Sequence, residues 1–338
     1  MANRRNRAVW AAVVVALVGV LGSCTSAATP TNAVTPTNTA GPSATGLPSD
    51  GPTPADSAPA APTLSNAVGP SAIGLPSGAP TTTDVAPTTT GGGPVAPVRV
   101  LQMNLCNSGF APCFTGRAVA QAATVIHSEI PDLVTVNEIC EDDLPALQRA
   151  LAEVIPDGDV VSAFQGASDR DTGDVYRCRN GRPYGIGLVS RWPSVPGSTA
   201  AGGIYPSQDT EDDEERAWLC LGVAASPAMT VCTTHLADTK LEVAAAQCAY
   251  VFGTVIADLR EPDPVMPVVL GGDLNLGSGD SEHLGSCLPA ASAHADDGGV
   301  QHVVATPEFV VGGSQLIDLL GTTDHPGLLV TLAPRAHG

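Results

Sequence analysis

One long segment of biased composition limits how much of this chain can fold. From Thr25 to about Pro97 the sequence consists mostly of Pro, Thr, Ala, Ser and Gly, and it contains no Lys, Arg, Cys or aromatic residue. Such a segment cannot bury enough apolar surface to offset the entropy lost on ordering. We therefore predict a disordered tether over residues 25–97 and a single folded domain over residues 98–338.

The first residues predict export. A basic start is followed by an apolar run from Ala8 to Leu21, which is too short to span a bilayer comfortably and so favours a signal peptide. The run ends in Leu21-Gly22-Ser23-Cys24, which resembles the bacterial lipobox, whose Cys becomes the lipidated first residue of the mature protein. Cleavage near Ser26-Ala27-Ala28 is the alternative. Residues 1–24 are thus a predicted signal peptide with lipidation at Cys24, and the protein is expected at the cell surface or secreted.

The cysteine count is also consistent with an exported protein. An even number of cysteines in the folded part of an exported chain predicts disulfides, although the sequence cannot choose their connectivity. Cys106 and Cys113 are the simplest pair to predict, because only a short loop separates them. The spacings do not match a zinc pattern, so structural pairing is favoured over metal ligation. The eight cysteines of the domain are Cys106, Cys113, Cys140, Cys178, Cys220, Cys232, Cys248 and Cys287.

The net charge limits which classes of binding partner the chain can have. The formal net charge is −19 at pH 7, and acidic residues gather in runs such as Glu211 to Glu215. We interpret that run as a solvated acidic loop, with a weak calcium site as the less favoured alternative. Broad, tight binding to nucleic-acid phosphates needs clustered Lys and Arg, and the composition argues against it.

The hydrophobic pattern predicts more strands than helices. The two kinds of element do not strictly alternate, so two packed sheets with helices outside fit better than a parallel α/β arrangement. The predicted fold class is therefore α+β. Strands are expected at 98–104, 132–138, 184–190, 218–224, 229–234, 267–270, 300–305 and 328–332, and helices at 119–130, 144–154 and 241–259.

Polar residues recur where the predicted strands end. A single polar residue there means little, because strands commonly finish in polar turns. Several acid, amide and imidazole groups at such ends predict convergence at one edge of the sheets, where oxygen ligands could hold a divalent ion. These residues are Asn104, Glu138, His235, Asp273, Asn275, Asp324 and His325.

The stretch VVLGGDLNLG, residues 268–277, has the composition of a turn after a strand. Gly, Asp and Asn favour turns because they accept positive φ and make local side-chain hydrogen bonds. We expect Gly271 and Gly272 to let the backbone bend at the strand end, so that Asp273 and Asn275 share a cavity with Glu138 and His235.

Taken together, the motifs resemble the DNase-I-like endonuclease/exonuclease/phosphatase superfamily, in the order typical of that family. The resemblance covers nearly the whole domain and implies a four-layer α/β/β/α sandwich of two mixed sheets that cleaves phosphate esters with a metal. The motifs are VLQMN with Asn104, PDLVTVNE with Glu138, YGIGLVSRWP with Tyr184, Arg216 before a strand, TTHL with His235, GGDLN with Asp273 and Asn275, and TDHPGLL with Asp324 and His325.

The resemblance implies a role for the oxygen-bearing residues. Glu138 would be the principal metal ligand, with Asn104 and Asp324 close to the ion. Asp273 and Asn275 would orient or activate the attacking water. The implied ion is Mg²⁺, or alternatively Mn²⁺ or Ca²⁺, because a positive charge must neutralise the phosphodiester before a nucleophile can approach.

The nitrogen-bearing and aromatic residues have implied roles as well. His235 and His325 would bracket the phosphate as hydrogen-bond donors or acid/base groups. Arg216 would contact the phosphate, although it follows the acidic run and could simply pair with it. Tyr184 would line the pocket, and plain packing at a strand start is the alternative for this residue.

The sequence departs from the family pattern at three places. Many members carry an Asp where this chain has Cys106, so one metal contact would be missing. Gln301 stands where the family has an Asp that orients the C-terminal histidine. Asp318 could supply the missing carboxylate, but it lies too near His325 in sequence to match the spacing of the family. Pro326 follows His325 directly, so the local turn should differ.

Two functions from different classes follow. The first is an exported, monomeric, metal-dependent phosphoesterase, a phosphodiesterase or nuclease-like hydrolase whose substrate could be a nucleic acid, a lipid head group or a small molecule. The alternative is a catalytically inactive, surface-tethered binding module with the same fold, motivated by the three departures. In either case the membrane would be contacted only through the N-terminal lipid.

Overall fold

The structure, a computed structural model, describes residues 96–336. The predicted signal peptide, the lipidated Cys24 and almost all of the predicted tether lie outside the described residues. The description below therefore concerns the predicted domain alone.

Two six-stranded mixed sheets form the centre of the domain. The first has the order β13-β14-β1-β2-β5-β3, and the second has the order β11-β12-β10-β9-β8-β6. The first comprises β1 (Val98–Asn104), β2 (Leu133–Cys140), β3 (Val161–Gly166), β5 (Tyr184–Ser190), β13 (Phe309–Ile317) and β14 (Gly327–Pro334). The second comprises β6 (Ala201–Ile204), β8 (Ala217–Val223), β9 (Met229–His235), β10 (Val268–Asp273), β11 (Ala293–Asp296) and β12 (Gln301–Ala305), and a small separate pair comprises β4 (Ser168–Asp169) and β7 (Glu214–Glu215).

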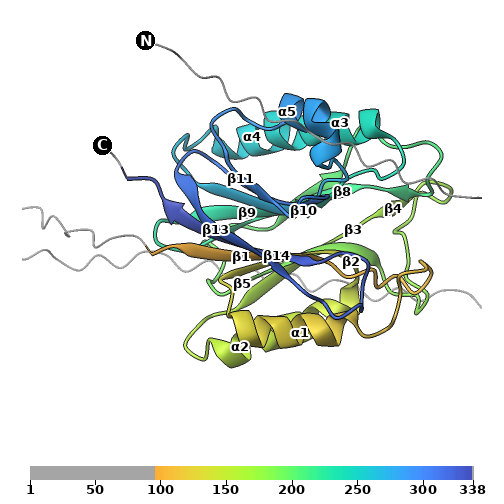
Figure 1. Ribbon diagram of the computed structural model, residues 1–338, viewed down its shortest axis with the longest axis horizontal. Helices are drawn as coiled ribbons and strands as arrows, with labels where there is room; N and C mark the ends of the chain where they lie inside the picture. Colours follow the sequence, from red (N-terminus) through yellow and green to blue (C-terminus); the bar gives the residue numbers. More distant parts are fainter. Residues whose placement is uncertain (1–95, 337–338) are drawn as a thin grey trace, which may run out of the picture. The chain divides into compact units, whose positions relative to one another are not determined.

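Helices cover the outer face of each sheet (Figure 1). The first sheet carries α1 (Ala118–Glu129) and α2 (Leu144–Val154), and the second carries α3 (Leu241–Tyr250), α4 (Ile256–Arg260) and α5 (Ser281–Cys287). The layers run helix, sheet, sheet, helix, so the predicted α+β four-layer sandwich is confirmed.

Strand alternation divides most of the apolar residues among three large cores. Val269 of β10 packs between the two sheets, whereas its neighbours Val268 and Leu270 pack under the helices of the second sheet. In β2, Leu133 packs between the sheets and Val134 packs under α1 and α2. Burial of side chains on both faces explains why these strands are continuous apolar runs.

The space between the sheets changes from apolar to polar along the strands. Inward residues near the start of the parallel strands, such as Val100 and Val231, are apolar, whereas those toward the carboxyl ends of β1, β2 and β10 and at the start of the antiparallel β12 are polar and fully buried. We call five of these later residues the polar seam: Gln102, Thr135, Asn137, Asp273 and Gln301, each at most 1% exposed.

Hydrogen bonds within the polar seam join the two sheets. From the first sheet, Gln102 Nε2 donates to Asn137 Oδ1 at 2.6 Å and to Gln301 Oε1 of the second sheet at 3.0 Å. Gln301 Nε2 donates to Asp273 Oδ2 at 2.6 Å, and the Asp273 backbone N–H donates back to Asn137 Oδ1 at 2.9 Å. Because buried polar groups are costly unless paired, this ring of partners fixes how the sheets face one another.

The glycines of VVLGGDLNLG have a different role from the one predicted. Both lie inside β10, and neither has positive φ, so they do not form a bend. A Cβ on Gly271 would collide with Thr135 Oγ1 of the polar seam, and one on Gly272 would collide with the carbonyl oxygen of Thr234. They are glycines because other atoms approach the strand closely.

Adding a methyl group at Gly271 should therefore destabilise the domain. We expect Gly271→Ala to lower the free energy of unfolding by about 1–3 kcal/mol, because the polar seam must shift to admit the side chain. The measurement is thermal or urea unfolding of the purified protein. Gly313→Ala is the matched control, since Gly313 also lies in a strand but a Cβ there meets no atom within 4 Å. Equal stabilities for the two variants would contradict the close-approach explanation.

Four disulfides stabilise the domain. Cys106 is joined to Cys113, which confirms the predicted pair. The other bonds join Cys140 to Cys178, Cys220 to Cys232, and Cys248 to Cys287. The preference for disulfides over thiolate metal ligation is thus confirmed, and a disulfide-rich domain is typical of oxidising compartments.

The predicted helix over residues 241–259 is divided in the structure. A π-helical turn at Val251–Val255 separates α3 from α4. The combined run Leu241–Arg260 is long and apolar enough to cross a membrane, but Ala244, Cys248 and Val251 pack in the core beneath it. This run covers the outer face of the second sheet, and its apolar residues are explained by their packing against that sheet.

Candidate active site

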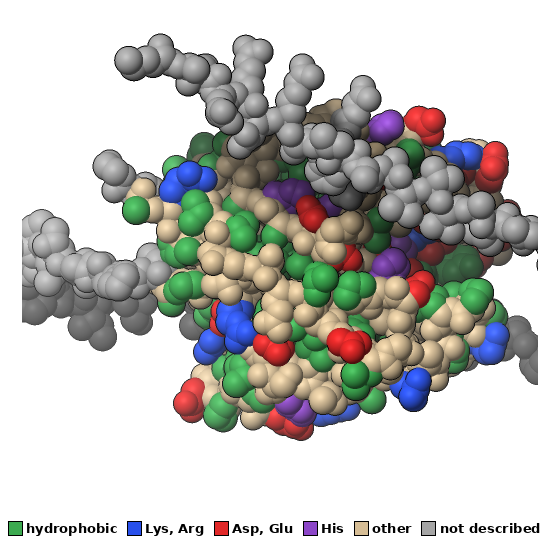
Figure 2. All heavy atoms as spheres, viewed as in Figure 1, with side chains coloured by type: hydrophobic (Ala, Val, Ile, Leu, Met, Phe, Trp, Pro, Cys, Tyr) green, Lys and Arg blue, Asp and Glu red, His purple; other side chains and the backbone are tan. Residues whose placement is uncertain are grey.

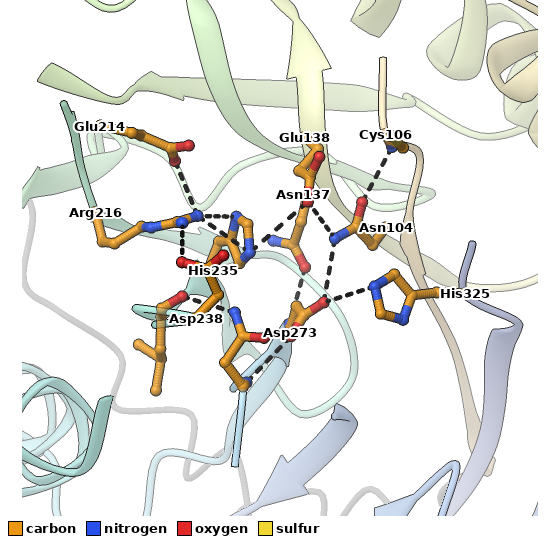
Figure 3. A network of polar contacts seen from close by, with 12 residues as sticks. Asn104, Cys106, Asn137, Glu138, Glu214, Arg216, His235, Asp238, Asp273 and His325 are labelled. Atoms are coloured by element: carbon orange, nitrogen blue, oxygen red, sulfur yellow. Dashed lines mark hydrogen bonds and ion pairs between the residues drawn. The ribbon is translucent and has the colours of Figure 1, made fainter. Parts of the chain in front are cut away.

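One open cavity of about 480 Å³ collects the predicted site residues. They come from strands of both sheets and from the loops that follow them (Figure 3). Only Asn104 lies behind the wall, where it bonds two of the lining carboxylates. The predicted residues that line the cavity are Glu138, Tyr184, Arg216, His235, Asp273, Asn275, Asp324 and His325.

Strand register explains this convergence. β1 runs parallel to β2, and β9 runs parallel to β10, so the carboxyl ends of each pair meet at one edge. Asn104 pairs in register with Asn137, and His235 pairs with Asp273. Inward-facing residues at the carboxyl ends of two parallel strands therefore lie side by side. They continue the row of inward-facing polar residues that forms the polar seam.

Glu138 reaches the cavity through a local irregularity. By simple alternation it would face the helices, because Asn137 faces the other sheet. A register shift between Val136 and Ile139 and a φ of 55° at Glu138 turn its side chain toward the cavity. Positive φ is unfavourable for a residue with a Cβ, so this strain is a feature typical of functional sites.

Glu138 and Asp273 are held together by one amide. Asn104 Nδ2 donates to Glu138 Oε1 at 2.8 Å and to Asp273 Oδ2 at 3.1 Å. Burial raises the pKa of both carboxyls, and the neighbouring Asp273 and Asp324 charges raise the pKa of Glu138 further. Two carboxylates so close together repel each other, and a cation between them would relieve the repulsion.

The orientation of Asn104 follows from its partners. Its Oδ1 accepts the backbone N–H of Cys106 at 3.0 Å, so its amino group must face the carboxylates. Asn104 thus positions Glu138 and Asp273, and its direct ligation of a metal stays a prediction. Cys106 is tied to Cys113 and offers no ligand, which is the departure expected from the sequence.

Gln301 is bonded to Asp273 and holds no histidine. His325 Nε2 lies 3.8 Å from Asp273 Oδ2 and 3.8 Å from Asp324 Oδ1, so these carboxylates are its nearest acidic neighbours. Asp318, the substitute considered from the sequence, accepts the backbone N–H of Leu320 through its Oδ1. The imidazole of His325 therefore lies beside the aspartates of the cavity.

Asn275 is held by the turn that follows β10. Its φ is 49°, its backbone N–H donates to Asp273 Oδ1 at 3.1 Å, and its Nδ2 donates to the carbonyl oxygen of Leu236 at 2.8 Å. With Nδ2 engaged, its Oδ1 is the atom left to meet a substrate or a water molecule. The prediction that Asp273 and Asn275 share one cavity with Glu138 and His235 is confirmed.

His235 is a buried, neutral imidazole. Arg216 Nη1 lies 2.7 Å from His235 Nδ1 and 3.1 Å from Nε2, and we assign Nδ1, the nearer nitrogen, as the acceptor. Burial, the Arg216 charge and His325 lower the pKa of His235 well below its ordinary value. With this assignment the ring proton is on Nε2, which lies 3.9 Å from Glu138 Oε1.

Arg216 is surrounded by three carboxylates. Its guanidinium contacts Glu214 at 3.1 Å, Asp212 at 3.2 Å and Asp238 at 3.0 Å. The pairing with the acidic run, one of the two alternatives, is thus present, and contact with a phosphate stays a prediction. The interpretation of that run as a solvated loop is wrong for Glu214, whose side chain is only 13% exposed. Its burial raises its pKa to about 7, and Tyr184 lies against it.

The raised pKa of Glu214 predicts a pH-dependent stability. A carboxyl with a pKa near 7 when folded and 4.5 otherwise binds its proton more tightly in the folded state. Its contribution therefore favours folding at low pH and is lost as the pH rises from about 4.5 to about 7. We expect the Tm of the wild type minus that of Glu214→Gln to fall over this range and then level off. Glu153→Gln, at the surface of α2, is the control, and a difference independent of pH would contradict the assignment.

Several lining residues were not predicted. Asp212 and Asp238 bind Arg216, and Phe110 and Tyr176 form part of the wall. Phe110 lies in the loop closed by the Cys106–Cys113 disulfide, and 59% of its surface is exposed. The sequence offered one signal for Phe110: it lies in a short predicted disulfide loop directly after the strand that ends at Asn104, a predicted site residue.

The charge balance of the cavity fits a bound cation. Six carboxylates line it, against one arginine and two histidines of which His235 is neutral. An anionic phosphate would be repelled by this wall unless a cation were also present. Carboxylate oxygens are the donors that Mg²⁺ prefers, so the side chains present are suited to that ion.

Comparisons with known proteins identify the fold. No family model and no curated protein matches the sequence. An endonuclease/exonuclease/phosphatase from Beutenbergia cavernae has a similar structure, with 23% identity, a TM-score of 0.53, and coverage of 70% of this chain and 72% of that one. The human Nocturnin catalytic domain with bound sulfate anion has 14% identity and a TM-score of 0.53 over 71% of this chain and 94% of that one.

A third similar structure is an endonuclease/exonuclease/phosphatase family protein from Bacteroides thetaiotaomicron. It has 12% identity and a TM-score of 0.51, and the match covers 71% of this chain and 99% of that one. At these identities the likeness shows a shared fold, and it confirms the resemblance inferred from the ordered motifs at that level.

Proposed function

We propose that this chain, which has the fold of the DNase-I-like endonuclease/exonuclease/phosphatase superfamily, is an exported metal-dependent phosphoesterase that acts as a phosphodiesterase or nuclease-like hydrolase. One observation carries the proposal: Glu138, His235, Asp273 and the adjacent pair Asp324 and His325 line a single cavity although they come from four distant segments of the sequence. Convergence of acids and imidazoles from several strand ends is the arrangement that phosphoryl chemistry requires.

A divalent ion would be held mainly by Glu138 and Asp324, with Asn104 positioning the first of these. When bound, such an ion neutralises charge on the non-bridging oxygens and on the leaving group. We propose Mg²⁺, with Mn²⁺ or Ca²⁺ as alternatives, because the available donors are oxygens.

The remaining residues would act on the water and the phosphate. Asp273 and Asn275 are neighbours through the 3.1 Å bond between Asn275 N–H and Asp273 Oδ1, and together they could orient a water molecule. Asp273, with its raised pKa, is a suitable acceptor for the water proton. The Nε2–H of His235 would donate to a phosphate oxygen, and His325 would act from the opposite side near Asp324.

The charge distribution favours a substrate of limited size. Lysine and arginine total 15 in the chain, and Figure 2 shows them scattered over the visible face without a continuous basic surface. A long nucleic acid needs such a surface, so we propose a small or extracellular phosphoester, or a short nucleic-acid end, as substrate.

Export and anchoring complete the proposal. The four disulfides suit an oxidising compartment, and the N-terminal pattern suits a signal peptide with lipidation at Cys24. Residues 25–97 would tether a monomeric domain to the membrane. Incorporation of labelled fatty acid into the wild type but not into Cys24→Ser would support the anchor, and equal labelling would contradict it.

The proposed activity can be tested on a panel of phosphoesters. The full chain should hydrolyse a generic phosphodiester with Mg²⁺, lose this activity in EDTA, and regain it when Mg²⁺ is restored. The alternative function is an inactive binding module, which the Cys106–Cys113 disulfide and Gln301 on Asp273 favour. Calorimetry separates the two, because an inactive module should show no Mg²⁺ binding that depends on Glu138.

A further inference from the structure

A second group of metal-ligand side chains lies on the hairpin formed by β11 and β12. His294 and Asp296 are two residues apart on β11, and His302 lies directly opposite Asp296 on β12. This register places all three side chains on the same face of the sheet. Val304 of that face packs against the helices, whereas Ala295 and Val303 face the other sheet, so the group lies on the outer side.

The three ligand atoms are close enough to share one ion. They all lie within 4.8 Å of one another, with His294 Nε2 2.9 Å from His302 Nδ1 and 3.8 Å from Asp296 Oδ2. In a tetrahedral zinc site, bonds of about 2.0–2.1 Å place neighbouring ligand nitrogens about 3.3 Å apart. The observed separations bracket that value.

His302 already has the orientation of a metal ligand. It is fully buried, and its Nε2 donates to the carbonyl oxygen of Leu276 at 2.9 Å. This bond fixes the tautomer, so the lone pair is on Nδ1 and faces His294. A ligating histidine characteristically donates its other ring N–H to a carbonyl or a carboxylate in this way.

We propose that His294, Asp296 and His302 form a zinc site separate from the catalytic cavity. Two imidazole nitrogens and one carboxylate oxygen make a typical zinc donor set. The side chains of His294 and Asp296 are 24% and 36% exposed, so the ion can enter from solvent and a water molecule can complete the tetrahedron. This proposal goes beyond the phosphoesterase proposal and does not depend on it.

Zinc binding requires one local change. In the structure His294 donates its Nε2–H to His302 Nδ1, and the two ring planes differ by only 15°. On binding, the His294 proton moves to Nδ1 and the ring turns, so that both lone pairs meet at the ion. His294 is the partly exposed partner and can turn while His302 stays bonded to Leu276.

A bound ion would stabilise one edge of the second sheet. β11 is the terminal strand of that sheet, and His302 directly follows Gln301 of the polar seam. An ion shared by β11 and β12 would therefore restrain the strand that carries the hydrogen bond to Asp273. The expected role is structural support close to, but outside, the cavity.

Zinc titration of the full chain tests this proposal. After treatment with a chelator, the wild type should bind one equivalent of Zn²⁺ more than His294→Gln does, and Co²⁺ should produce the visible absorption of a tetrahedral site in the wild type but not in His294→Gln. Glu138→Gln should keep this equivalent, because it alters only the catalytic cavity. His127→Gln, on the exposed face of α1, is the matched histidine control and should behave as the wild type.

Asp296→Asn gives a second readout. We expect it to weaken Zn²⁺ binding by about 10-fold or more while leaving the fold intact, because Asp296 is partly exposed. Two results would overturn the proposal: Zn²⁺ binding unchanged by His294→Gln, or Zn²⁺ binding lost only in Glu138→Gln. Failure of the phosphoester assay leaves these measurements unaffected, so the two proposals can fail separately.

Discussion

Replacing Glu138 with glutamine will reduce the Mg²⁺-dependent hydrolysis of a phosphodiester by on the order of 10³-fold in kcat/KM. Glutamine has the same size and can still accept the hydrogen bond that Asn104 donates to Oε1. The loss therefore comes from removing one negative charge from the cavity. The measurement is steady-state hydrolysis over a series of Mg²⁺ concentrations.

The same variant should bind Mg²⁺ at least about 10-fold more weakly by calorimetry. Glu153→Gln is the control, because Glu153 lies on the exposed surface of α2 and pairs with His127. Hydrolysis by Glu138→Gln within a few-fold of the wild type, at saturating Mg²⁺, would rule out Glu138 as the principal ligand.

Replacing His235 with alanine will reduce kcat/KM by about 10²–10⁴-fold, the range for loss of a hydrogen-bonding or acid/base group at the reacting phosphate. Because burial and Arg216 hold the pKa of His235 well below its ordinary value, the side chain stays neutral at physiological pH. The ratio of wild-type to His235→Ala activity should therefore be the same at pH 6 and at pH 8.

The pH series also tests how His235 acts. If its imidazole became protonated over this range, the activity ratio would change with pH, and the assignment of a permanently neutral donor would be wrong. His127→Ala serves as the control, since His127 is exposed and pairs with Glu153. Unfolding curves of both variants should match the wild type before the activities are compared.

Much of the fold follows from the sequence because its strands are buried on both faces. Continuous apolar runs that end in polar residues predicted β1, β2, β5, β8, β9, β10, β12 and β14. The pattern did not predict β13, whose residues are mostly exposed, the partly buried edge strand β3, or the short strands β4, β6, β7 and β11. Edge strands bury little, so their side chains carry a weak periodic signal.

Many of the residues that line the cavity were named from the sequence, but the reasons for their geometry were not. Sequence order and strand ends indicated that Glu138 and Asp273 converge, whereas the positive φ at Glu138 depends on contacts between distant strands. Gly271 is an example. The composition of its segment predicted a bend, whereas the structure requires glycine there to leave space for Thr135. A requirement imposed by a neighbour from another sheet leaves no local signal.

The acidic run shows the same limit. Local sequence describes Glu214 as one of five consecutive acids in a solvated loop, yet the fold places it beside Arg216 and Tyr184. Burial of a charge depends on where the partner lies in space. The pairing with the nearby Arg216 was an alternative offered by the sequence, but the contact of Glu214 in β7 with Tyr184 of β5 could be located only from the fold.

The polar seam has a further consequence for how the domain opens. Its hydrogen bonds cross from one sheet to the other, so neither sheet can separate without leaving several buried amides unpaired at once. The two sheets should therefore unfold as one cooperative unit. In hydrogen exchange, the backbone amide of Asp273 should open to solvent only with global unfolding, and at the same rate as the amides deepest in β1.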